Sequence, residues 1–145
     1  CIGRRDVIAA FRKLRSQIDF GMFLPLQKAA VAALTGPTQR VKDQCMEYQK
    51  RRDALCGGLR QIGWDVPNSH GSMFVWARIP ESFSDSMEFC LRLMEESGVI
   101  CTPGSSFGPL GEGYVRFALT LPVDQIHQAV EAIDACGICR SEVSI

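Results

Sequence analysis

Residues 71–80 read Gly-Ser-Met-Phe-Val-Trp-Ala-Arg-Ile-Pro, and here the apolar side chains change from helical spacing to strand spacing. Because successive side chains of a strand point to opposite faces, the stretch has two sides, both largely apolar. One side holds Met73, Val75, Ala77 and Ile79, and the other holds Phe74, Trp76 and Arg78. Pro80 ends the pattern because it has no backbone N–H for a sheet ladder. A strand over residues 73–79 is therefore predicted.

The sequence before this strand has helical periodicity. Apolar residues recur three and four positions apart over residues 6–18, 22–34 and 38–62, which predicts three helices. Asp6 is the expected N-cap of the first helix. Gly63 is the expected residue that closes the third, since glycine readily adopts the left-handed conformation found there.

Helical and strand patterns alternate after Pro80. The predicted elements are a helix from Asp85 to Gly98, a short strand over 99–102, a glycine-rich loop over 103–113, a strand over 114–121 and a helix from Pro122 to Gly137. This order predicts an α/β fold, a two-layer sandwich in which helices pack on one face of a small mixed sheet, plus an N-terminal helical arm. The predicted divisions are an interdomain arm over 1–36, the folded domain over 37–137 and a frayed tail over 138–145.

Composition excludes several classes of protein. The 145 residues are 46% hydrophobic and 22% charged with a net charge of zero, which argues against disorder and against binding to nucleic acid or an anionic membrane. No apolar run approaches the roughly 20 residues of a membrane helix. The chain begins at Cys1 rather than Met, which we interpret as the interior of a longer polypeptide.

Seven cysteines are scattered along the chain, several of them at apolar positions of helices or strands. This usage favours free thiols in a reducing, cytoplasmic environment over a disulfide framework. Cys136-Gly-Ile-Cys139 is a CxxC sequence, but it follows a helix instead of opening one, so no redox or metal role is assigned to it. The phosphate-loop, dinucleotide-binding, zinc-protease and serine-hydrolase motifs are absent as well. We assign no catalytic, cofactor-binding or metal-ligating residue in this chain.

The segment from Thr102 to Leu119 is the best candidate for a binding site. Alternation along its strand places Arg116 on the side opposite the apolar residues Val115 and Phe117, next to a glycine-rich loop. A guanidinium on a rigid strand is well suited to hold a carboxylate through two parallel hydrogen bonds. Two ordinary interpretations stay open at this point, namely a solvated surface arginine and a loop that merely joins two strands.

Several ordered stretches together resemble one family. They are residues 19–30, 48–55, 71–80, 103–108 and 111–119. In this order they resemble the C-terminal part of class I/II pyridoxal-phosphate aminotransferases of the aspartate-aminotransferase fold type, nearest the alanine and LL-diaminopimelate aminotransferase branch. The resemblance extends to about Cys136, and the tail with Cys136 and Cys139 is not part of the family pattern.

The resemblance implies a substrate site. Arg116 would bind the α-carboxylate of an amino acid or 2-oxo acid substrate, and Phe107, Gly104 and Phe74 would line the entrance to that site. For these last three residues, ordinary packing or loop geometry is an equally good explanation.

The resemblance also implies pyridoxal phosphate as the cofactor of a full-length parent. In the family, the lysine that binds the cofactor lies before the position where this chain starts, and Lys13, Lys28, Lys42 and Lys50 lie outside that motif. We therefore expect no cofactor on this chain and no transamination by it alone.

The implied partners are the large domain of the same polypeptide and a second copy in a homodimer, with no nucleic acid and no membrane. The apolar residues Phe20, Met22, Phe23, Leu24 and Leu26 are expected to pack on one of these partners. The alternatives are a stand-alone regulatory module that binds amino acids and an interaction domain without a ligand.

Overall fold

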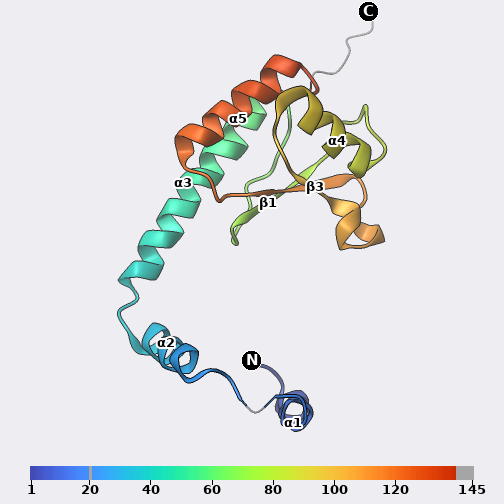
Figure 1. Cartoon of the computed structure of the whole chain (residues 1–145). Coiled ribbons are helices and arrows are strands. Elements are labelled where there is room, and N and C mark those ends of the chain that lie inside the picture. Colours follow the sequence, from blue (N-terminus) through green and yellow to red (C-terminus); the bar gives the residue numbers. More distant parts are fainter. Residues whose placement is uncertain (20, 140–145) are drawn as a thin grey trace, which may run out of the picture. The chain divides into compact units, whose positions relative to one another are not determined.

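The computed structural model describes residues 1–19 and 21–139 (Figure 1). The chain divides into two compact units, Cys1–Arg40 and Val41–Ile145. The first unit contains α1 (Arg5–Arg15) and α2 (Leu24–Thr35), and α3 (Gln39–Gln61) begins at its end and continues into the second.

The helices of the first unit bury none of their residues. Their large apolar side chains are exposed, namely Val7, Phe11, Leu14, Leu24, Leu26, Val31 and Leu34, and so are the nearby Ile18, Met22 and Phe23. Phe20 lies outside the described residues. Many exposed apolar side chains in one segment are typical of a segment that binds another surface, so the expected contact with a partner stays a prediction.

Asp6 is not the N-cap of α1, which corrects the sequence prediction. The N-cap is Arg4, and its guanidinium donates to both carboxylate oxygens of Asp6, at 2.8 Å from Nε and 2.6 Å from Nη2. This pair lowers the pKa of the Asp6 carboxyl below its usual value. A carboxylate in the first turn is also favoured by the helix dipole, so Asp6 is accommodated within the first turn of α1 instead of capping it.

The second unit is built on a three-stranded sheet of β1 (Phe74–Arg78), β2 (Thr102–Pro103) and β3 (Tyr114–Ala118). The strand order is β1-β3-β2, and both pairings are antiparallel. The predicted α/β class is confirmed, but the described ladders are not mixed. The reason is topological: β1 and β2 run in the same direction, and β3 inserts between them, so no two parallel strands are neighbours.

Three helices supply the layer that covers one face of this sheet: α3, α4 (Ser86–Ser97) and α5 (Val123–Cys136) (Figure 1). Trp64 lies in their shared core, where its ring meets Phe89 and Phe117 edge to face and its Nε1 donates to the carbonyl of Arg78 at 2.7 Å. The side chains of the core are Leu55, Cys56, Leu59, Trp64, Val66, Val75, Ala77, Ile79, Phe89, Cys90, Leu93, Val115, Phe117, Leu119, Ile126, Val130, Ile133, Ile138 and Cys139.

The predicted helix ends of the second unit are confirmed. Asp85 caps α4 by accepting hydrogen bonds from the backbone N–H groups of Met87 and Glu88 at 2.7 and 2.9 Å. Gly98 and Gly137 end α4 and α5 with positive φ angles of 73° and 71°, which a side chain would disfavour.

The tail begins later than the sequence suggests. Ile138 and Cys139 are buried against the core, so the expectation of a frayed segment from residue 138 is wrong for these two. The left-handed turn at Gly137 reverses the chain after α5, and the apolar Ile138 and Cys139 then pack onto the core. Residues 140–145 lie outside the described part.

The described residues also bear on the cysteines, on metals and on membranes. All seven cysteines are free thiols, with Cys1 and Cys45 exposed and Cys56, Cys90 and Cys139 buried. Within residues 1–19 and 21–139 there is no cluster of three or more side chains suited to a metal ion. None of the helices in the same residues has the length and apolarity needed to cross a membrane.

Adjacent glycines in α3 give opposite predictions. A methyl group on Gly57 would meet nothing within 4 Å, so Gly57→Ala should stabilise the protein by about 0.5–1 kcal/mol through reduced backbone entropy. A methyl group on Gly58 would lie 3.0 Å from both γ-carbons of buried Val130, so Gly58→Ala should destabilise it by about 1 kcal/mol or more. Urea unfolding of both variants measures the difference, and equal effects would contradict close packing of α3 on α5.

Candidate functional site

Arg116 lies at the centre of the sheet face that the helices leave uncovered. Its neighbours Val115 and Phe117 point into the core and are buried, whereas Arg116 is half-buried on the opposite face. The register places Trp76 of β1 and Thr102 of β2 directly opposite it on either side. The predicted outward orientation of Arg116 follows from this alternation and from the central position of β3.

Aromatic rings surround the guanidinium. Its Cζ lies 4.1 Å from the ring centroid of Phe74 and 4.4 Å from that of Phe107. Trp76 meets Phe107 edge to face at 5.6 Å and stacks on Tyr114 at 5.7 Å. Cation–π contacts of this kind fix the plane of the guanidinium while leaving its N–H groups, which lie in that plane, free to bind a ligand.

The guanidinium has no acceptor among the described residues. In residues 1–19 and 21–139 no hydrogen bond or ion pair to Arg116 is formed, and no buried side-chain nitrogen or oxygen there is left without a partner. Its unpaired nitrogens are therefore open to solvent. A fixed, solvent-accessible guanidinium with apolar walls is suited to a planar anion such as a carboxylate.

Gly104 lies at the base of the loop beside this face and is buried. A methyl group at Gly104 would lie 1.9 Å from the carbonyl oxygen of Gly111, and one at Gly111 would lie 2.0 Å from that of Gly104. The two ends of the loop, η1 (Gly104–Phe107) and η2 (Pro109–Gly111), thus touch backbone to backbone. The structure gives Gly104 a packing role, and this role places Phe107 against Arg116.

A hydrogen-bonded network ties the same loop to the start of α4. Glu112 Oε1 accepts from the backbone N–H groups of Ser86 at 2.7 Å and Gly113 at 2.8 Å. The Ser86 hydroxyl donates to Glu112 Oε2 at 3.2 Å and lies 3.0 Å from Ser105 Oγ. These bonds lower the pKa of the Glu112 carboxyl below its usual value, the bond from Gly113 most strongly. The network holds the loop that carries Phe107.

Glu112 gives a pH-dependence prediction. Because its pKa is lower in the folded state, its contribution to stability is present above the unfolded-state pKa of about 4.3 and is lost as pH falls through the folded value. Glu112→Gln should therefore unfold more easily than the parent sequence at pH 7, and the two should converge as pH falls below the folded-state pKa of Glu112. Thermal unfolding across this range measures it, and a constant difference at all pH values would show that the carboxylate charge is irrelevant.

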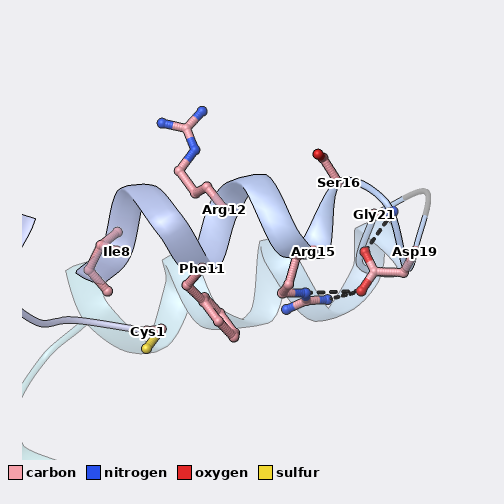
Figure 2. A pocket seen from close by; sticks show the side chains of 8 residues that line it. All are labelled: Cys1, Ile8, Phe11, Arg12, Arg15, Ser16, Asp19 and Gly21. Atoms are coloured by element: carbon pink, nitrogen blue, oxygen red, sulfur yellow. Dashed lines mark hydrogen bonds and ion pairs between the residues drawn. The ribbon is translucent and has the colours of Figure 1, made fainter. Parts of the chain in front are cut away.

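Figure 2 shows a shallow groove along α1, far from these residues in sequence. Ile8 and Phe11 give it an apolar side, and the Arg15 guanidinium pairs with Asp19 at its other end, 2.5 Å apart. The predicted site residues Arg116, Phe107, Gly104 and Phe74 do not line it. The groove is therefore not the site that the sequence predicts.

Comparisons with known proteins agree with this architecture. The model of the family "Aminotransferase class I and II" matches residues 1–133. The chain belongs to the class I and II aminotransferase family. It is 41% identical over 132 residues to an LL-diaminopimelate aminotransferase of Halothermothrix orenii, covering 91% of this chain and 34% of that protein.

Two further aminotransferases extend the comparison. The glutamate-pyruvate aminotransferase AlaC of Escherichia coli is 43% identical over 136 residues, covering 92% of this chain and 33% of that protein. The structure of a probable N-succinyldiaminopimelate aminotransferase from Thermus thermophilus superposes with a TM-score of 0.81 at 31% identity, covering 93% of this chain and 36% of that one. The chain thus spans about a third of the length of the relatives it matches.

Aminotransferases of this family depend on pyridoxal phosphate, which such enzymes bind through a lysine. Lys13, Lys28, Lys42 and Lys50 are all exposed on helices, and none of them lines the groove along α1. No step that runs through the cofactor is therefore derived from this chain.

The structure also places residues at this candidate site that the sequence pattern did not assign to it. Trp76 was placed on the outward side by alternation alone, but its position opposite Arg116 needs the β1–β3 register. Thr102 and the network of Glu112 with Ser86 carry no sequence signal for such a role, because they depend on elements far apart in the chain.

Proposed function

We propose that this chain is the C-terminal small domain of a pyridoxal-phosphate-dependent aminotransferase, which transfers an amino group between an amino acid and a 2-oxo acid. In this proposal the domain binds the substrate and closes over the site, and it is not catalytic alone. The observation that carries it is Arg116, a guanidinium with no acceptor among residues 1–19 and 21–139, fixed by two aromatic rings on an uncovered sheet face.

Arg116 would bind the α-carboxylate, the group that every amino acid and 2-oxo acid substrate shares. Two parallel N–H···O bonds fix both the position and the plane of a carboxylate, and this orients the adjacent Cα. Phe74 and Phe107 would exclude water from one side of the pair, which strengthens the charge interaction. Gly104 would act through the loop by holding Phe107 in place.

The remaining parts of the enzyme would come from outside the described residues. The large domain of the same polypeptide would supply the cofactor and its lysine, and a homodimer partner would complete the assembly. The exposed apolar side chains of α1 and α2 support this part of the proposal, because they form the kind of surface that another domain covers. Closure of the small domain over the substrate would exclude water during the reaction.

A chimeric enzyme tests the proposal. The matching third of the Escherichia coli aminotransferase AlaC is replaced by this chain, and amino transfer from glutamate to pyruvate is measured. The chimera should transaminate and should show the absorbance of bound pyridoxal phosphate. Circular dichroism and cofactor absorbance control for folding. A chimera that folds and takes up the cofactor but does not transaminate would count against the proposal.

The isolated chain provides the second arm of this experiment. Calorimetric titration with L-alanine, L-glutamate and 2-oxoglutarate should show almost no binding, because a site completed by another domain lacks most of its contacts. Tight binding by the isolated chain, lost in Arg116→Ala, would instead favour the stand-alone regulatory module.

A further inference from the structure

Two thiols from neighbouring elements are in contact. Cys90 lies on the inner side of α4, and Cys101 lies directly before β2, an element that packs on α4. Their sulfur atoms are 3.3 Å apart. A disulfide bond is about 2.05 Å long, so the sulfurs would need to approach by roughly 1.3 Å to form one.

Other thiols of the second unit make a different kind of contact. The thiol of buried Cys56 lies 3.7 Å from the carbonyl oxygen of Pro67, and the thiol of Cys136 donates to the carbonyl of Ile133 at 3.1 Å. Both contacts leave an ordinary packed thiol beside a backbone acceptor. Cys90 and Cys101 differ because each is the hydrogen-bonding neighbour of the other.

We propose that Cys90 and Cys101 are an oxidisable pair, which hydrogen peroxide converts into a disulfide between α4 and the start of β2. In the first step one sulfur, as its thiolate, attacks the peroxide, so an S–O bond forms, the O–O bond breaks and water leaves. In the second step the other sulfur displaces the hydroxyl group from this sulfenic acid, which leaves as a second water. The two thiols lose two hydrogens, and the peroxide is reduced to water.

The bond would act close to the sheet face described above, although it does not depend on the proposed function. Cys101 directly precedes Thr102, the residue opposite Arg116 in the β2–β3 register. A disulfide to Cys90 would fasten this edge of the sheet covalently to α4. Thr102, which lies opposite Arg116, would then be held by this covalent bond as well as by the two-residue pairing of β2 with β3.

Burial decides how the oxidation must be measured. It raises the pKa of both thiols, so the reactive thiolate is scarce at neutral pH and the pair reacts more slowly than an exposed cysteine. Cys1 and Cys45 are exposed and would form bonds between molecules first. The protein used is therefore the full chain with Cys1→Ser and Cys45→Ser, and its fold is checked by circular dichroism.

Peptide mapping after peroxide treatment tests the proposal. Trypsin cleaves after Arg78, Arg92 and Arg116, which places Cys90 in peptide 79–92 and Cys101 in peptide 93–116. Without reduction, mass spectrometry should find the two peptides joined, with a mass two hydrogens below their sum, and reduction should separate them. A bond between Cys136 and Cys139 would stay within peptide 117–140 and is thereby distinguished.

Three controls make the outcome decisive. Cys101→Ser should abolish the joined species, whereas Cys56→Ser should retain it. Urea-unfolded protein should give roughly tenfold less of it, because unfolding removes the high effective concentration of the two thiols. Recovery of both peptides as free thiols from oxidised native protein, or equal yields from native and unfolded protein, would overturn the proposal.

Discussion

Arg116→Ala should lower the kcat/KM of the AlaC chimera by about 10²–10³-fold. Two charge-assisted hydrogen bonds to a carboxylate are worth about 3–4 kcal/mol together, and each 1.4 kcal/mol corresponds to a factor of ten. Because the amino donor and the 2-oxo acid acceptor share the α-carboxylate, the loss should be of similar size for both substrates. Steady-state kinetics with each substrate varied in turn measures it.

Two further variants separate charge, geometry and general surface effects. Arg116→Lys keeps the positive charge but loses the planar pair of donors. Its kcat/KM should therefore lie between that of the parent chimera and that of Arg116→Ala. Arg78→Ala is the matched control, because Arg78 of β1 is an exposed arginine on the same face of the sheet as Arg116. It should change kcat/KM less than about twofold. Equal losses in Arg78→Ala and Arg116→Ala would refute a specific carboxylate contact.

Gly104→Ala should destabilise the protein by about 3 kcal/mol or more and lower its melting temperature by about 10 °C or more. Its new methyl group would lie 1.9 Å from the carbonyl oxygen of Gly111 and 2.7 Å from that of Tyr114. Both obstacles are backbone atoms, so no side-chain rotation relieves them, and the loop must separate from β3. Calorimetric melting of the isolated chain measures the change.

Gly71→Ala is the matched control, since a methyl group there would meet nothing within 4 Å. It should change stability by less than about 0.5 kcal/mol. Gly111→Ala should be as damaging as Gly104→Ala, and the double variant should cost less than the sum, because both methyl groups force open the same contact. Stability of Gly104→Ala close to that of Gly71→Ala would show that the loop ends do not touch.

Much of the fold of the second unit follows from local patterns. The strand at 74–78, the Asp85 cap and the glycine ends of α4 and α5 each depend on residues close together in the sequence. The outward position of Arg116 also follows from simple alternation along one strand. The predicted cap at Asp6 failed because Arg4 occupies the cap position and pairs with the Asp6 carboxylate. The predicted frayed tail failed at Ile138 because this side chain packs on the core after Gly137.

The sequence by itself determined the α/β class, the helical arm, the family resemblance and Arg116 as the candidate carboxylate ligand, because periodicity and ordered motifs are local properties. Only the tertiary structure decided what surrounds that arginine. The insertion of β3 between β1 and β2 makes each described strand pairing antiparallel and places Trp76 and Thr102 beside Arg116. The contact of Gly104 with Gly111 and the pairing of Cys90 with Cys101 likewise join residues that are separated in the chain. Such contacts depend on how elements pack against one another, which no single stretch of sequence specifies.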